Sequence, residues 1–181
     1  MRSFVALELK DEGVKDRIAQ LQRQLLKSGA TLKAVERQNL HITLKFLGEV
    51  PETAVGEIEA ALRGIRLEPF SLHFKGVGSF PSISRINVVW VGVVEGAEKV
   101  EALHEAVEGA LAPFGHPERF HSHLTIMRVK GGRKVGELVK SVMALSQEEI
   151  GTAFFESFQL KKSVLTPSGP VYSDLATFPL R

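Results

Sequence analysis

The sequence predicts an α+β protein in which one pattern of strands and helices occurs twice. Apolar residues recur at helical spacing in four segments, and alternating or continuous apolar runs mark strands between them. The same pattern, His-apolar-Thr-apolar, begins at His41 and at His123, which are 82 residues apart. We therefore expect an internally duplicated α+β unit, with two similar lobes related by a pseudo-twofold axis.

The first half follows the order strand–helix–strand–helix–strand. Strands are expected at 4–9, 40–47 and 70–76, and helices at 13–28 and 52–65. Both helices have apolar residues three or four positions apart, and the second begins just after a proline, whose fixed φ suits a first helical turn.

The second half repeats this order. Strands are expected at 86–94, 122–129 and 152–165, and helices at 97–113 and 134–145. A closing strand at 171–178 follows the turn Pro167-Ser168-Gly169-Pro170. The repeat thus covers approximately 4–76 and 86–165 of a single bilobal domain over 1–181.

Composition excludes several classes of protein. The absence of cysteine excludes a disulfide scaffold, a thiolate zinc site, an iron–sulfur cluster and a cysteine nucleophile. The 23 basic and 21 acidic residues give a net charge of +2, which argues against a protein that coats nucleic acid by net charge alone. No apolar run approaches the ~18 residues of a membrane span, and Glu8 and Lys10 make the N-terminus a poor signal peptide. A cytoplasmic protein without membrane contact is expected, with a monomer as the default.

Side-chain alternation places the His and Thr of each motif on one face of its strand and the apolar residues on the other. By the same alternation Lys45 and Met127 fall on the histidine face, whereas Phe46 and Arg128 fall on the opposite face. The apolar faces should pack on helices, so the two His/Thr faces should meet in a shared cleft.

A lone histidine on a strand is more often structural than catalytic, but here the whole pattern recurs at equivalent points of both halves. Two imidazoles and two hydroxyls suit in-line displacement at phosphorus. One neutral imidazole takes a proton from the nucleophile, and one imidazolium protonates the leaving oxygen. The Thr hydroxyls can donate hydrogen bonds to the non-bridging oxygens, where charge concentrates.

Four segments together resemble a known family. The motif regions are VERQNLHITLKFLG at 35–48 and HLTIMRV at 123–129, and the ends are MRSFVAL at 1–7 and LKKSVLTPSGPVY at 160–172. They resemble the two-histidine phosphoesterases, and among these the RNA 2′,3′-cyclic phosphodiesterases, also called 2′-5′ RNA ligases. The resemblance covers essentially the whole chain. Met127 departs from it, because a small residue is usual there.

The resemblance implies a bilobal fold in which two antiparallel sheets flank a central cleft with helices outside. Strands can cross between lobes, so the lobes need not be the contiguous halves. The partner is implied to be RNA with a 2′,3′-cyclic phosphate terminus, or nucleotides. Water opens this phosphate to a 2′-phosphate, and the reverse chemistry is 2′-5′ ligation.

The resemblance also implies residue roles. His41 is the proton donor to the leaving 3′-oxygen and His123 the proton acceptor from water, although these two roles can be exchanged. Four further residues are implied to bind the substrate: Thr43, Thr125, Phe46 and Arg128. His121 and His123 form a His-x-His pair, but no carboxylate falls inside either motif, so no metal and no cofactor are predicted.

Other features allow two interpretations. Four cations around a Gly-Gly turn form either a solvated loop or an RNA-backbone contact, to which Lys45 could contribute: Arg128, Lys130, Arg133 and Lys134. Trp90 lies among apolar residues and is expected in the core, and Tyr172 is expected either to hydrogen-bond in the cleft or to pack. The same chemistry on small cyclic nucleotides or ADP-ribose cyclic phosphate, and a non-catalytic RNA-end-binding module, remain alternatives.

Overall fold

The computed structural model describes all 181 residues. They form nine strands, four α-helices and two short 3₁₀ helices, the latter at Arg37–Asn39 and Glu52–Ala54. The strands are β1 Arg2–Glu8, β2 Leu32–Ala34, β3 His41–Glu49, β4 Phe70–Pro81, β5 Ile86–Glu95, β6 His123–Val129, β7 Glu149–Phe155, β8 Ser157–Thr166 and β9 Gly169–Pro179. The helices are α1 Glu12–Leu26, α2 Val55–Arg63, α3 Ala97–Ala110 and α4 Val135–Ala144.

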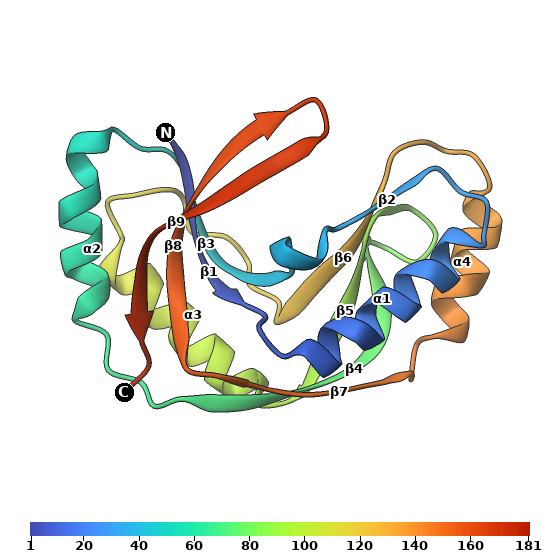
Figure 1. The fold of residues 1–181 in the computed structure, drawn as a ribbon, viewed down its shortest axis with the longest axis horizontal. Coiled ribbons are helices and arrows are strands. Elements are labelled where there is room, and N and C mark those ends of the chain that lie inside the picture. Colours follow the sequence, from blue (N-terminus) through green and yellow to red (C-terminus); the bar gives the residue numbers. More distant parts are fainter.

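The strands form two separate antiparallel sheets. Sheet A has the order β3-β1-β8-β9, and sheet B has the order β2-β6-β5-β4-β7. In Figure 1 sheet A occupies the left half, with α2 and α3 on its outer side, and sheet B occupies the right half, with α1 and α4 outside. The predicted α+β fold with two antiparallel sheets and outer helices is confirmed.

Each sheet draws its elements from both halves of the chain. The second-half helix α3 packs on β3 of sheet A, and the first-half helix α1 packs on β6 and β7 of sheet B. Strand β4, from the first half, lies within sheet B, and β8 and β9, from the second, lie within sheet A. The two motif strands are therefore each covered by a helix from the opposite half.

The core lies between each sheet and its helices. Helix α1 begins at Asp11, whose carboxylate accepts a hydrogen bond of 2.8 Å from the backbone N–H of Val14. Its buried side chains recur at helical spacing, and they face the outer side of sheet B: Val14, Ile18, Leu21 and Leu25. The strands supply alternate apolar residues to the same layer, and burial of this apolar surface is the main stabilising contribution.

One expected strand was wrong, and one observed strand, β2, was not predicted. The single strand at 152–165 is two strands, β7 and β8, which belong to different sheets and are separated at Glu156. The sequence has no glycine or proline between Thr152 and Thr166, so no turn signal marks this crossover. The three-residue β2 is too short to show a period. The segment 76–78 lies within β4, next to an irregularity in its pairing with β5.

The β8–β9 hairpin extends beyond sheet A toward the other sheet (Figure 1). Its tip contacts β2, where the Lys33 Nζ donates a hydrogen bond of 2.6 Å to the carbonyl of Ser168. The two lobes are thus linked at the hairpin as well as through the crossing chain. None of the helices has the length and apolar character needed to cross a membrane.

Candidate active site

The two His-x-Thr-x motifs begin two neighbouring strands of different sheets. His41 is the first residue of β3 and His123 the first of β6, and these strands contact each other. We call the sheet face that carries the motif His and Thr the inner face, and the face under the helices the outer face. The inner faces of sheets A and B thus bring together the histidines that the sequence singled out.

Both imidazoles are held in the same way. The Nδ1 of His41 lies 2.7 Å from the carbonyl oxygen of Asn39, and the Nδ1 of His123 lies 2.6 Å from that of His121. Because a carbonyl oxygen only accepts, Nδ1 carries the hydrogen in both rings. The Nε2 of each neutral ring is therefore left as the basic nitrogen, available to take or, once protonated, to give a proton.

The threonines accompany the histidines on the inner faces. The Thr43 Oγ1 lies 2.9 Å from the His41 Nε2, to which its hydroxyl donates while that ring is neutral. Thr125 is half-buried and lies opposite Trp90 of β5. Each motif thus places one hydroxyl beside one imidazole.

Both histidines are shifted toward the neutral form. Burial lowers the pKa of His41 from 6.5 to about 4; the Asn39 carbonyl opposes this shift, and the positive charges of Lys161, Arg128 and His123 add to it. Burial also lowers the pKa of His123, against the opposing effect of the His121 carbonyl. Two of the groups that lower the pKa of His41, Arg128 and His123, belong to the other sheet.

A β-bulge at Leu44 changes which side chains of β3 reach the inner face. Ala6 of β1 pairs with Thr43, but the next residue, Val5, pairs with Lys45, so Leu44 is an extra residue. The bulge reverses the alternation that follows it. Phe46 therefore lies on the inner face, half-exposed, in contrast to the expectation from simple alternation.

Strand β6 has the corresponding bulge at Ile126. Trp90 pairs with Thr125 and Val89 pairs with Met127, so Ile126 is the extra residue. The predicted strand faces of the two residues beyond the bulge, Met127 and Arg128, were both wrong. Met127 is fully buried on the outer face, and Arg128 is exposed on the inner face with the motif residues.

Lys45 was also expected on the histidine face and lies instead on the outer one. Its side chain is buried, and its Nζ is 2.8 Å from the Glu108 carboxylate of α3. This ion pair joins a helix to a motif strand. Lys45 is therefore unavailable as an RNA-backbone contact.

Aromatic rings surround His41 in sheet A. The ring of Tyr172 stands edge-on to the imidazole with centroids 5.6 Å apart, and Phe4 lies 5.2 Å away. Phe46 extends this cluster, 6.2 Å from Phe4. Burial raises the pKa of Tyr172, against the lowering effect of Arg128 and Arg2. Tyr172 thus packs against His41 at the site. Packing is one of the two roles that the sequence left open for it.

A second aromatic group surrounds His123 in sheet B. Phe80 stands edge-on to the imidazole with centroids 4.9 Å apart, and Trp90 lies 6.3 Å away. The expectation that Trp90 is a core residue was wrong. It lies on the inner face opposite Thr125, and its indole covers Gly78, where a Cβ would overlap the ring.

Lys161 is an inner-face residue that the sequence argument missed. It lies opposite Phe4, is buried, and its Nζ is 2.7 Å from Asp174 and 3.8 Å from Glu8. Its charge contributes to the lowered pKa of His41. The only signal was a lysine alternating with apolar residues along β8, and such a pattern is common on solvated strands.

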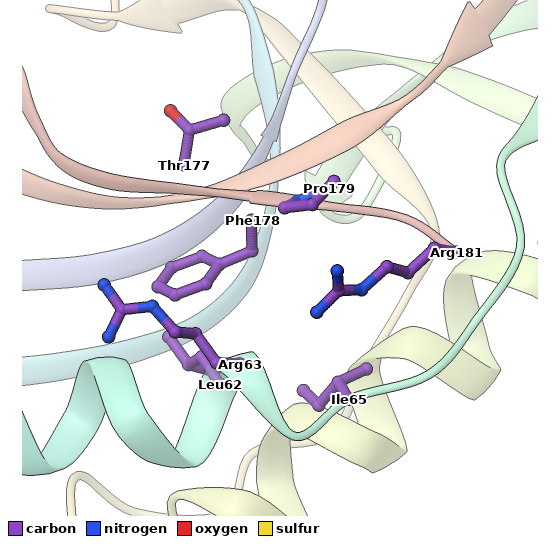
Figure 2. Close-up of a pocket in the computed structure, with 7 residues that line it drawn as sticks. All are labelled: Leu62, Arg63, Ile65, Thr177, Phe178, Pro179 and Arg181. Atoms are coloured by element: carbon purple, nitrogen blue, oxygen red, sulfur yellow. The ribbon is translucent and has the colours of Figure 1, made fainter.

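Two cavities lie away from the motif residues. One of about 180 Å³ lies between α2 and the end of β9, and Figure 2 shows Arg63 and Arg181 beside its apolar lining. Another of about 620 Å³ lies at the ends of β4 and β5 and the start of α3. Neither is lined by a motif residue. No group of three or more His, Asp or Glu side chains in the chain could hold a metal ion.

A family model and individual relatives of known name agree on the family to which this chain is similar. Residues 7–90 match the model of the LigT like Phosphoesterase family. The RNA 2′,3′-cyclic phosphodiesterase of Aeropyrum pernix is 41% identical over 162 residues, which are 88% of this chain and 92% of the relative. The protein of that name from Archaeoglobus fulgidus is 40% identical over 180 residues, 98% of this chain and 99% of the relative.

Solved structures agree with these sequence relatives. TT0787 of Thermus thermophilus superposes with a TM-score of 0.78 at 30% identity, over 100% of this chain and 98% of that one. The apo form of E. coli LigT superposes with a TM-score of 0.79 at 25% identity, over 99% and 96% of the two chains.

Proposed function

Because this chain belongs to the LigT-like phosphoesterase family, whose members above are named RNA 2′,3′-cyclic phosphodiesterases, we propose that it hydrolyses 2′,3′-cyclic phosphate ends of RNA to 2′-phosphates. One observation carries the proposal. His41 and His123, on contacting strands of two sheets, each direct a basic Nε2 away from a carbonyl-bound Nδ1. Two such groups are what acid–base displacement at phosphorus requires.

In the proposed reaction His123 is the general base and His41 the general acid. The His123 Nε2 takes a proton from water as the water oxygen bonds to phosphorus. The P–O3′ bond breaks, and the 3′-oxygen takes a proton from the His41 Nε2. The products are a free 3′-hydroxyl and a 2′-phosphate, and no metal or cofactor takes part. A 5′-hydroxyl of a second RNA in place of water gives a 2′-5′ linkage by the same step.

The lowered pKa of His41 fits this role only with substrate bound. Free His41 is neutral at pH 7, because its pKa is about 4. The cyclic phosphate carries a negative charge, which stabilises a neighbouring imidazolium and raises its pKa. Substrate binding therefore favours the protonated form of His41, which is the general acid. Because burial disfavours the charged imidazolium, the protonated ring readily gives its proton to the leaving oxygen.

The remaining inner-face residues supply binding groups. The hydroxyls of Thr43 and Thr125 and the guanidinium of Arg128 are donors for the non-bridging phosphate oxygens, where negative charge grows in the transition state. The half-exposed ring of Phe46 offers a stacking surface to the terminal base.

The test is incubation with a short RNA that ends in a 2′,3′-cyclic phosphate, in excess chelator, with the product isomer identified by chromatography. We expect a 2′-phosphate at an undiminished rate. His41→Asn and His123→Asn should each lower the rate by at least ~100-fold. His116→Asn, at an exposed histidine of the α3–β6 loop, is the matched control and should match the unaltered enzyme. Loss of activity in chelator, or near-full activity of either motif variant, would refute the proposal.

Cleavage of a nucleoside 2′,3′-cyclic phosphate or ADP-ribose cyclic phosphate in preference to the RNA would instead assign the same chemistry to a small substrate. Tight binding of the RNA end without any turnover would assign a binding module.

A further inference from the structure

In each lobe a polar side chain lies among the apolar residues on the helix face toward the sheet. In α1 this is Gln22, and in α3 it is His104. The two positions are 82 residues apart, as are their buried neighbours on the same faces: Ile18 and Val100, Leu21 and Leu103, Leu25 and Val107. A polar residue thus occupies the same place in both lobes.

Both side chains donate to the bulged residue of a motif strand. The His104 Nδ1 lies 2.7 Å from the carbonyl oxygen of Leu44. The Gln22 Nε2 lies 2.9 Å from the carbonyl oxygen of Ile126 and 2.9 Å from that of Val35. Because the acceptor is a carbonyl, His104 Nδ1 carries the hydrogen. Each helix therefore reaches the bulged residue that precedes the fifth position of its motif strand.

Both carbonyls belong to buried residues and therefore need hydrogen-bond partners within the protein. Leu44 is 2% exposed and Ile126 is 0% exposed, so water does not replace a lost donor. The His104 ring is itself held by a parallel stack on Phe120, with centroids 4.2 Å apart. At Ile126 a backbone donor, the N–H of Val35, shares the oxygen with Gln22.

The bulges determine what the inner faces present. Without the bulge at Ile126, simple alternation would turn Arg128 to the outer face and Met127 to the inner one. Without the bulge at Leu44, Phe46 and Lys45 would be exchanged in the same way. We propose that Gln22 and His104 are positioning residues, which fix the two bulges and thereby hold Arg128 and Phe46 on the inner faces. The inference rests on the proposed function for the role of those two side chains.

The proposal predicts two different defects. Gln22→Leu removes the helix donor to the bulged Ile126 carbonyl and leaves only the Val35 N–H, so it should raise KM for the cyclic-phosphate RNA by about 10-fold, the value of one charged hydrogen bond. It should weaken binding of inorganic phosphate similarly, because the lost contact is to phosphate. His104→Leu should raise KM for the RNA through Phe46 but leave phosphate binding unchanged.

A double-mutant cycle separates positioning from general loss of structure. In an Arg128→Ala background Gln22→Leu should raise KM by less than about 2-fold, because the group it positions is already gone. The same holds for His104→Leu in a Phe46→Ala background. The proposal would be overturned if a helix variant raised KM by the same factor in both backgrounds, or if it left the KM of the otherwise unaltered enzyme unchanged.

Replacement of His104 by glutamine, the residue type that the other lobe uses, gives a second test. His104→Gln keeps a donor of the kind that the other lobe uses, and it should restore the KM that His104→Leu loses. If Gln22→Leu does not fold, this pair decides: a rescued KM supports positioning, and equal KM values for the two His104 variants overturn it. If the unaltered enzyme cleaves no cyclic phosphate, the proposed function fails, and calorimetric phosphate binding by the Gln22 and Arg128 variants still tests the positioning.

Discussion

Phe46 and Arg128 occupy the same place in their two strands. Each is the sixth residue of its motif, two positions beyond a bulge, and each lies exposed on the inner face of its sheet. The fifth residues, Lys45 and Met127, are both buried under helices. The two lobes thus use one backbone arrangement to present two different chemistries, an aromatic ring from sheet A and a guanidinium from sheet B.

Replacement of Arg128 tests the phosphate-binding half of this arrangement. Arg128→Ala should raise KM for cyclic-phosphate RNA by about 10- to 100-fold, because a charged hydrogen-bond donor is lost. Arg128→Lys should recover part of this loss, since it keeps the charge without the planar fork. Arg119→Ala, at an exposed arginine of the α3–β6 loop, is the matched control. Steady-state kinetics showing equal KM for the Arg119 and Arg128 variants would exclude the role.

The sequence predicted that each motif places its histidine and threonine on one strand face, because that placement depends on residue identity at a fixed spacing. It also predicted most strands and helices, whose apolar periods are long enough to recognise. It misplaced Lys45 and Met127 because alternation was assumed to continue unbroken, and it misplaced Trp90 because apolar neighbours were taken to indicate the core. A bulge depends on register with a partner strand and on a donor from a distant helix, and neither is encoded within the strand itself.

The pH dependence of kcat/KM should reflect the lowered pKa values of the free histidines. The productive form carries one proton on the pair, and it is most populated between the pKa of His41, about 4, and that of His123, below 6.5. We therefore expect a bell-shaped kcat/KM profile with its maximum below pH 6.5. The kcat profile should lie at higher pH, because bound phosphate raises both pKa values. A monotonic rise of kcat/KM through pH 8 would contradict paired acid–base catalysis.

The stability of the folded protein should fall in acid, because folding lowers the pKa of His41. The pKa of His41 is lower in the folded protein than in the unfolded chain, so the unfolded chain binds more protons between about pH 6.5 and 4. The contribution of neutral His41 is fully present above pH 6.5 and is lost as pH falls toward 4. Thermal unfolding should show Tm decreasing over this range, with a smaller decrease in His41→Asn. The same slope in both proteins would show that His41 does not titrate as expected.

The basic turn after β6 distinguishes a polymer substrate from a small one. Arg133 and Lys134 are exposed there, close along the chain to Arg128. Neutralising both, as Arg133→Gln with Lys134→Gln, should raise KM for a long RNA more than KM for a nucleoside 2′,3′-cyclic phosphate, because only the polymer brings additional phosphates to the turn. The difference should shrink at high salt. Equal increases for the two substrates would mean that the turn does not contact the RNA backbone.

Gly78 tests whether the aromatic wall beside His123 matters for activity. A Cβ at this position would overlap the indole of Trp90, so Gly78→Ala must move the ring away from Gly78 and change its contacts with His123 and Phe80. Trp90 is the only tryptophan, and its emission therefore reports this shift directly. We expect altered fluorescence together with a rate reduced by about 10-fold or more, since small displacements of an acid–base group are costly. Gly56→Ala, where a Cβ meets nothing within 4 Å, should change neither the emission nor the rate. Altered emission with an unchanged rate would show that the position of His123 does not depend on the wall of Trp90 and Phe80.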